Sequence, residues 1–263
     1  MADIKRQLQQ RLDSLAAAGI DWLPRGHVVA YTSPTAEPDM PKAKTPKAKT
    51  PSAPPVTIAL PEALIGDVTT QLTLLAKEIA GCKKCPELFS TRTQTVFGVG
   101  PVAPELCFIG EAPGADEDAK GEPFVGRAGQ LLDKIIVAMG LQRSEVYICN
   151  TLKCRPPNNA TPTPVQCANC RPYFEKQIDL IKPKWICCLG ATALRNVLSI
   201  EPKQQLNLGQ YRGKIHSFRG INVVATYHPA YLLRNPSAKA DVWNDMKFLL
   251  TQMGRPIPDV KKT

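Results

Sequence analysis

Residues 106–133 read LCFIGEAPGADEDAKGEPFVGRAGQLLD, and this stretch decides the fold. It begins as an uninterrupted apolar run, Leu106–Gly110, and then turns sharply at Glu111-Ala-Pro-Gly. A loop rich in glycine and acidic residues follows, which carries an apolar Phe124, and a helix is expected to begin near Ala128. An apolar run without polar alternation is typical of a strand buried on both faces of a parallel sheet.

Three later apolar runs have the same character. They are VYIC before Asn150, WICCL before Gly190 and INVVAT before Tyr227 and His228. Strands that alternate with helices predict a three-layer α/β/α sandwich around a mainly parallel, four-stranded central sheet. Ligands bind at the carboxyl ends of strands in open parallel sheets, so Glu111, Asn150 and His228 are expected to share one crevice.

The remaining elements follow from apolar periodicity. The predicted strands cover about 105–110, 145–150, 184–189 and 221–226. The predicted helices cover about 65–80, 128–140, 164–181, 191–198 and 238–253, with a hairpin-like stretch near 208–219. These elements assign residues 61–263 to one globular domain.

Composition limits the classes of function. The 263 residues carry a formal charge of +10, and this excess of basic residues favours a polyanionic partner such as nucleic acid. No apolar run approaches the roughly 18 residues of a membrane span. The first residues, MADIKRQLQQ, lack the apolar region of a secretory signal. A cytoplasmic protein without membrane contact is therefore expected.

Residues 1–60 differ from the rest of the chain. Ile4, Leu8, Leu12 and Leu15 lie on one face of a predicted amphipathic helix, which suits either docking to a partner or packing on the domain. The following PKAKTPKAKTPSAPP is rich in proline and lysine and is predicted to be a disordered linker. A replication or repair protein is one candidate partner for this segment.

The nine cysteines fall into two groups, and disulfides are not expected without an export signal. Four of them lie inside the apolar runs and are expected to be small core residues: Cys107, Cys149, Cys187 and Cys188. The other five lie in polar surroundings and are candidates for metal ligands: Cys82, Cys85, Cys154, Cys167 and Cys170. Their spacing leaves both a zinc site and an iron–sulfur cluster open.

At this point several motifs resemble a known family. GEAPGADEDAKGEPFVGRAG, NTLKCRPPNNATPTP, CRPYFEKQI, LGATA and YHPAYLLR, in this order, are similar to the family 4 uracil-DNA glycosylases of the iron–sulfur type. The resemblance covers about residues 66–253. It implies the uracil-DNA glycosylase-like fold and a DNA repair enzyme that flips uracil out of DNA and hydrolyses its N-glycosidic bond.

The resemblance also implies a cofactor. Cys82, Cys85, Cys154 and Cys170 would hold a [4Fe–4S] cluster, and Cys167 would be left over. Spacing alone would favour Cys167 and Cys170 as the second pair of metal ligands. The chain lacks the Lys-Arg-Arg-Ile-His insertion of relatives that trap their substrate covalently, so ordinary hydrolysis is expected.

Roles for the crevice residues follow from the same resemblance. Glu111 would activate water and Ala112 beside it would contact the substrate. Phe124 would stack on uracil, which its place in a glycine-rich loop also suits, although a purely core role was open before the resemblance. The remaining roles are Asn150 as reader of the uracil edge, His228 as donor to O2 of the leaving base, and Glu117 as the residue that excludes the thymine methyl.

An enzyme that flips a nucleotide must fill the gap that this leaves in the base stack. Leu232 and Leu233 are candidate wedges and Arg234 a candidate phosphate contact, the alternative being that the leucines belong to the core. Two other classes of function stay open, namely a zinc module that binds nucleic acid without catalysis and a subunit associated with a replication polymerase. For the glycosylase, a monomer that acts on uracil-containing single- or double-stranded DNA is expected.

Overall fold

The computed structural model describes residues 62–259. The amphipathic helix and the linker predicted for residues 1–60 lie outside the described residues. Within the described range, no helix is long and apolar enough to cross a membrane.

A five-stranded sheet forms the centre of the domain, in the order β2-β1-β3-β5-β4. Its first four members run parallel to one another, and only β4 is antiparallel. In chain order the strands are β1 (Leu106–Gly110), β2 (Tyr147–Asn150), β3 (Trp185–Leu189), β4 (His216–Phe218) and β5 (Ile221–Thr226). The mainly parallel sheet predicted from the sequence is therefore confirmed.

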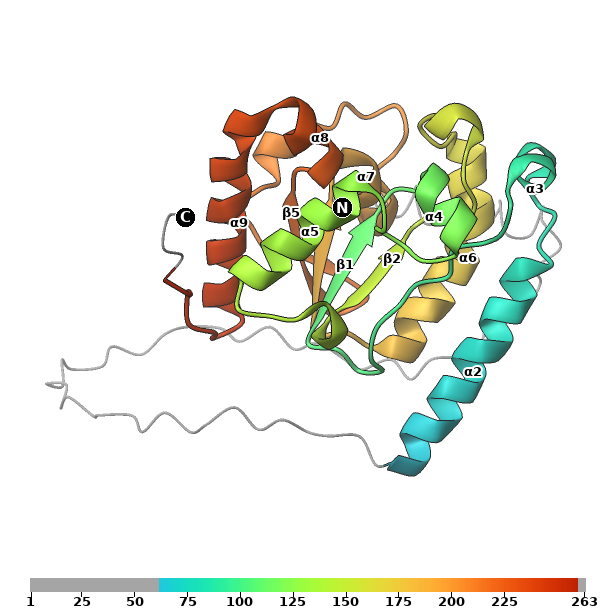
Figure 1. Ribbon diagram of the computed structural model, residues 1–263, viewed down its shortest axis with the longest axis horizontal. Coiled ribbons are helices and arrows are strands. Elements are labelled where there is room, and N and C mark those ends of the chain that lie inside the picture. Colours follow the sequence, from blue (N-terminus) through green and yellow to red (C-terminus); the bar gives the residue numbers. More distant parts are fainter. Residues whose placement is uncertain (1–61, 260–263) are drawn as a thin grey trace, which may run out of the picture. The chain divides into compact units, whose positions relative to one another are not determined.

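The chain changes direction across the sheet at β1, because β2 lies on one side of β1 and β3 on the other. Right-handed connections then place the helices on both faces. The helix α5 (Arg127–Ala138) packs on one face with α9 (Lys239–Gln252), and α6 (Pro164–Ile181) and α7 (Ala191–Leu198) pack on the other. Figure 1 shows these layers, with α2 (Glu62–Ala80) beside α6.

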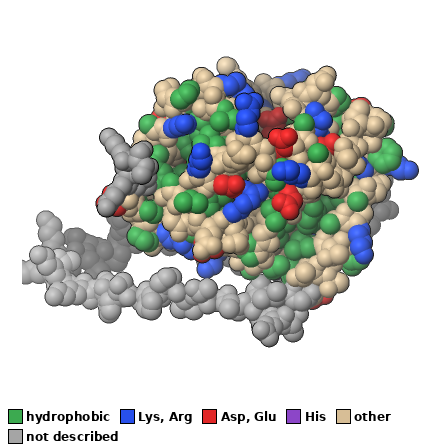
Figure 2. All heavy atoms as spheres, in the orientation of Figure 1, with side chains coloured by type: hydrophobic (Ala, Val, Ile, Leu, Met, Phe, Trp, Pro, Cys, Tyr) green, Lys and Arg blue, Asp and Glu red, His purple; other side chains and the backbone are tan. Residues whose placement is uncertain are grey.

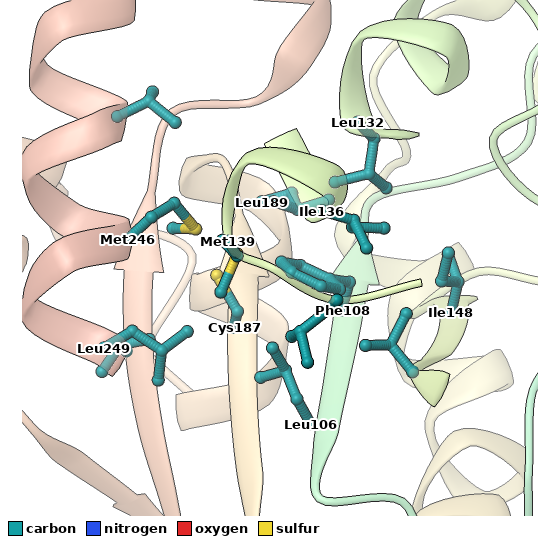
Figure 3. Close-up of a cluster of buried hydrophobic side chains, with 14 of the residues drawn as sticks. Leu106, Phe108, Leu132, Ile136, Met139, Ile148, Cys187, Leu189, Met246 and Leu249 are labelled. Atoms are coloured by element: carbon teal, nitrogen blue, oxygen red, sulfur yellow. The ribbon is translucent and has the colours of Figure 1, made fainter. Parts of the chain in front are cut away.

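Strand pleating divides the core into two clusters. Leu106 and Phe108 of β1 point to the α5 and α9 side, whereas Cys107 and Ile109 point to the α6 and α7 side. Figure 3 shows the first cluster, in which Phe108 lies among side chains from neighbouring strands and both helices. The cysteines of the apolar runs are fully buried, as expected: Cys107, Cys149, Cys187 and Cys188.

The sheet has one strand more than the four predicted. The stretch near 208–219 is expected to resemble a hairpin, and three residues near its end, His216–Phe218, form β4, which pairs with β5 at the edge of the sheet. Arg219 and Gly220 connect the two strands, with φ of 51° and 80°. Two successive residues with positive φ are typical of the tight turns that match the twist of a hairpin.

The long helices lie close to their predicted ranges, and α6 and α7 have the predicted ends. Three helices of six residues each were not predicted, because so short a segment has no readable periodicity. They are α3 (Pro86–Thr91), α4 (Ala115–Lys120) and α8 (Pro229–Arg234). Short 3-10 turns complete the chain at Arg143–Glu145, Pro157–Asn159, Leu208–Gln210 and Pro236–Ala238.

Replacement of Phe108 by alanine tests the central position of this ring. Phe108 is fully buried, so its removal should leave a cavity and lower the free energy of unfolding by about 3–5 kcal/mol. Chemical denaturation followed by circular dichroism measures this loss. Val137→Ala is the control, because Val137 is 68% exposed and should cost less than about 0.5 kcal/mol. Equal losses in the two variants would contradict the packing described here.

Candidate active site

A cavity of about 660 Å³ opens at the carboxyl ends of β1, β2 and β5. Its walls come from the loop after β1, from α4, from the start of α5 and from α8. Figure 2 shows basic, acidic and apolar side chains close together on the face that carries these helices. The volume is in the usual range for sites that bind small molecules. Most residues predicted to be functional line this cavity: Glu111, Ala112, Glu117, Phe124, Asn150, His228, Leu233 and Arg234.

Asn150 ends β2, and its side chain is almost completely buried, with 2% exposed. Its Oδ1 has no hydrogen-bond partner among the described residues, which is rare because a buried unpaired polar atom is costly. The adjacent strand ends at Gly110, where a Cβ would collide with this oxygen and lie 2.6 Å from the Phe124 ring. The absence of a side chain at Gly110 therefore lets the amide and the ring approach each other.

Phe124 stands in an unusual backbone conformation, with φ of 54°. Such values are uncommon for residues with a side chain and are found preferentially at functional sites. Gly129 makes this conformation possible, because a Cβ there would collide with the Phe124 carbonyl group. The ring is 5% exposed and lies 5.5 Å from the His228 ring, centroid to centroid. Phe124 thus belongs to the core and to the cavity wall at once.

Glu117 joins the two parts of the loop that carries Phe124. Its Oε2 accepts a hydrogen bond from Gly114 N at 3.0 Å, at the start of α4. Its Oε1 accepts from Val125 N at 2.9 Å and from Gly126 N at 3.0 Å. Three backbone donors therefore hold this carboxylate, and through it the position of Phe124 is fixed.

His228 occupies the N-cap of α8, where its Nδ1 accepts a hydrogen bond from Ala230 N at 3.1 Å. In the neutral ring the proton must then reside on Nε2. Burial lowers the pKa of His228 to about 4, an effect that the charge of Arg234 reinforces and that of Glu117 opposes. The histidine is therefore a neutral N–H donor at physiological pH.

Glu111 follows β1 directly, and its backbone carbonyl accepts hydrogen bonds from Leu152 N and from Thr151 Oγ1, both at 3.0 Å. Burial raises the pKa of its carboxyl group above the ordinary value, and a hydrogen bond with Thr192 partly opposes this rise. A carboxylate with raised pKa accepts a proton more readily, which suits a base that activates water.

The structure separates the three residues predicted to contact DNA. Leu233 is 44% exposed and lines the cavity together with Arg234. Leu232 is 1% exposed and packs in the core between the sheet and the helices. The prediction that Leu232 reaches DNA disagrees with this burial, because successive residues of a helix point in different directions. Of the two leucines, Leu233 alone lies at the rim of the cavity, beside Arg234.

Two further rim residues were missed in the sequence. Arg127 begins α5 and lines the cavity, as does Tyr231, whose ring stacks on Tyr227 with 5.0 Å between centroids. Tyr231 follows His228 by three residues, and this spacing on a short helix was the available signal. Arg127 directly follows the glycine that caps α5, a position that faces the loop.

The cysteines predicted as cluster ligands gather at one place. Cys154 and Cys170 are buried together against Leu88 and Leu152, and Cys85 packs on this group. Donor groups from the protein point at the sulfur atoms, as is usual around iron–sulfur clusters. The donors are Arg92 Nη1 to Cys154 at 3.0 Å, Lys153 N to Cys170 at 3.3 Å, Asn169 Nδ2 to Cys85 at 3.5 Å, and the Tyr173 hydroxyl to Cys82.

Cys167 differs from these four. Its sulfur accepts a hydrogen bond from Asn196 Nδ2 at 3.3 Å, and it lines a separate cavity of about 350 Å³ between α6 and α7. In residues 62–259, no three His, Cys, Asp or Glu side chains already stand in a metal-coordinating arrangement. The four other thiols are gathered but do not form a closed coordination shell by themselves. Two buried and two half-buried thiols with N–H and O–H donors beside them fit an iron–sulfur cluster.

Comparison of this sequence with known protein families agrees with the geometry of the site. The family model of the uracil DNA glycosylase superfamily matches residues 97–247, from the segment before β1 into α9. This range contains the sheet and every residue of the cavity. The α/β sandwich and the crevice at its strand ends therefore belong to a domain of the uracil DNA glycosylase superfamily.

Comparison with individual relatives identifies the family within this superfamily. The chain is 40% identical to a type-4 uracil-DNA glycosylase of Archaeoglobus fulgidus over 188 residues, which are 70% of this chain and 94% of the relative. It is 42% identical to the type-4 enzyme of Thermotoga maritima over 63% and 85% of the two chains, and 40% identical to that of Sulfurisphaera tokodaii over 67% and 82%. The chain belongs to the type-4 family of the uracil-DNA glycosylase superfamily.

The protonation of His228 can be measured directly. In ¹H–¹⁵N spectra recorded from pH 3 to pH 8, the imidazole of His228 should titrate with a midpoint near pH 4 and carry its proton on Nε2 above it. Because the unfolded chain binds this proton already below about pH 6.5, His228 should lower folding stability as the pH falls from 6.5 towards 4. A midpoint near 6.5 would contradict the buried, neutral state.

Proposed function

We propose that this chain is a DNA repair glycosylase that removes uracil from DNA by hydrolysis of its N-glycosidic bond. One observation carries the proposal: Asn150, Phe124 and His228 surround a single cavity, with an amide, an aromatic face and a neutral N–H donor. The type-4 relatives carry this activity in their names. In duplex DNA the base must leave the stack to enter the cavity, which costs a few kcal/mol.

Asn150 supplies the recognition of uracil. The amide oxygen, which lacks a partner, accepts from N3–H of the base, and the amide nitrogen donates to O4. Phe124 stacks on the ring and limits its depth. Ala112 contacts the base beside them, and Glu117 is a positioning residue that holds the Phe124 loop. The exclusion of the thymine methyl by Glu117 stays a prediction.

His228 and Glu111 carry the chemistry. Breakage of the glycosidic bond leaves a positively charged sugar and an anionic base. The neutral imidazole donates its Nε2–H to O2 of the leaving base, and this hydrogen bond strengthens as negative charge develops there. Glu111 holds the water that attacks the sugar and accepts its proton, which the raised pKa of the carboxyl group favours. The products are free uracil and an abasic site.

DNA contacts the rim of the cavity. Leu233 is exposed there and fills the space that the flipped nucleotide leaves, while Arg234 and Arg127 pair with backbone phosphates. The buried Leu232 supports α8 from the core side.

The cluster ligands in this proposal are Cys82, Cys85, Cys154 and Cys170. A [4Fe–4S] cluster held by these residues would join the segment before α3 to the chain after β2 and stabilise both. Arg92, Asn169 and Tyr173 orient the thiolates through their hydrogen bonds.

Some expectations stay predictions. They are the monomeric state, the cytoplasmic location, and the replication or repair partner of residues 1–60. The names of the type-4 relatives mention neither a zinc module without catalysis nor a polymerase subunit.

Replacement of Asn150 by aspartate tests both the activity and the reading of the base. The wild-type protein, incubated with a uracil-containing oligonucleotide and then with alkali, should produce strand scission at the uracil. Asn150→Asp should lower the single-turnover rate about 100-fold or more, because a carboxylate cannot donate to O4 and repels the developing anion.

Asn222→Asp is the matched control, since Asn222 is exposed on β5 at the other end of the sheet and should retain full activity. Unchanged activity in Asn150→Asp would remove Asn150 from base recognition. Absence of scission with the wild-type protein would refute the proposed function itself.

Single cysteine-to-serine variants test the ligand set. The purified protein should be brown and contain about four irons per chain. Cys154→Ser and Cys170→Ser should lose colour and iron, whereas Cys167→Ser should keep both. Iron analysis and the visible absorption spectrum measure the difference. A colourless Cys167→Ser variant beside a brown Cys170→Ser variant would show that the assignment is wrong.

A further inference from the structure

Lys153 is a completely buried lysine close to the active site, with 0% of its surface exposed. It follows the end of β2 by three residues, and its side chain turns back beneath its own strand. Its Nζ donates hydrogen bonds to Asn150 O at 2.7 Å, Gln177 Oε1 at 2.5 Å and Phe97 O at 3.1 Å. All three donor positions of the ammonium are therefore used.

The charge of this ammonium is not neutralised by a carboxylate. All three acceptors are neutral, and none of the ion pairs within residues 62–259 includes Lys153. The rings of Phe97 and Phe174 also face the ammonium, each with its centroid 5.9 Å from Nζ. Burial of a cation away from any carboxylate is unfavourable, so the hydrogen bonds of the ammonium must offset its desolvation. Its partners indicate what it does.

One partner is the main chain of the residue proposed to read the base. The segment after β2 is tied to the end of β1 by hydrogen bonds from Thr151 N to Gly110 O and from Leu152 N to Glu111 O, both at 3.0 Å. These bonds fix the peptide groups after Asn150 but leave its carbonyl group free. The ammonium of Lys153 donates to that carbonyl, so the peptide groups on this side of Asn150 are all held by hydrogen bonds.

A second layer holds the ammonium itself in place. Gln177 Nε2 donates to Tyr147 Oη at 2.9 Å and to Phe97 O at 3.0 Å. Both N–H groups of this amide are thus engaged, and its oxygen must face Lys153. The lysine cannot take another rotamer without breaking this network, so it acts as a rigid support.

We propose that Lys153 is a positioning residue for base recognition: its buried ammonium locks the carbonyl group of Asn150, so that the unpartnered amide of Asn150 meets the base at a fixed place. This proposal rests on the proposed uracil excision and extends it to a residue outside the cavity. Lys153 does not touch the base and acts through Asn150.

A double-mutant cycle tests this role. The single-turnover rate of uracil excision is measured for the wild type, Lys153→Met, Asn150→Ala and the double variant. Lys153→Met should lower the rate about 10-fold in the wild-type background, within the range known for residues of one hydrogen-bond network. In the Asn150→Ala background the same change should have almost no further effect, because the amide that Lys153 positions is already gone.

Lys184→Met is the matched control, since Lys184 is exposed just before β3 at the opposite end of the sheet. Because Lys153 N also contacts Cys170, iron content and melting temperature are recorded for every variant. If Lys153→Met does not fold, Lys153→Gln replaces it in the cycle. The glutamine amide can still donate to the Asn150 carbonyl. Lys153→Gln should therefore retain more activity than a folded variant whose side chain at position 153 has no hydrogen-bond donor.

Equal losses of several-fold in both backgrounds, from Lys153→Met or, where only that variant folds, from Lys153→Gln, would overturn the positioning role, since a general structural defect is independent of Asn150. The non-additive result supports it. An inactive wild-type protein would overturn the proposed function and this role with it, whereas an active wild type with additive losses would overturn the role of Lys153 alone.

Discussion

The close approach of three segments at the end of β1 is the constraint on which the site depends. Gly110 has no side chain, and this allows the Asn150 amide and the Phe124 ring to meet over the same strand end. Gly129, near the start of α5, also lacks a side chain, and this leaves room for the backbone carbonyl group of Phe124. A methyl group at either position would push the ring or the amide out of place. The cavity therefore exists because two glycines leave room for it.

The polar groups of the site are held by the backbone rather than by one another. Glu117 binds three backbone N–H groups, His228 accepts one, and Lys153 donates to two backbone carbonyls. Backbone partners belong to strands and helix ends that are themselves fixed, so each side chain has one orientation before any ligand arrives. Preorganised dipoles of this kind need no rearrangement as charge develops in the transition state. A neutral His228 fits this arrangement, because a buried donor is already in place.

Much of this organisation could be predicted from the sequence. The four parallel strands could be predicted because an uninterrupted apolar run is typical of a strand buried on both faces. The polar residues that follow three of these strands, Glu111, Asn150 and His228, are then expected to meet at one edge of the sheet. Leu232 and Leu233 show the limit, since two adjacent leucines look alike until the helix that separates them is known. The short helices and the role of Gly129 were equally invisible. A six-residue helix has no period, and a glycine inside a helix gives no sign of which backbone it must let pass. Nothing in the sequence around Lys153 indicates that its side chain is buried.

The strand order has a consequence for the folding of the chain during its synthesis. β5, which carries His228 at its end, lies between β3 and β4 in the interior of the sheet, yet it is among the last elements to leave the ribosome. A nascent chain that has released residues up to about α7 contains Asn150 and Phe124 but not His228. It can assemble neither the complete sheet nor the complete wall of the cavity. Translation that stops before β5 thus yields fragments whose sheet lacks an interior strand, and the central sheet can close only after nearly the whole domain has left the ribosome.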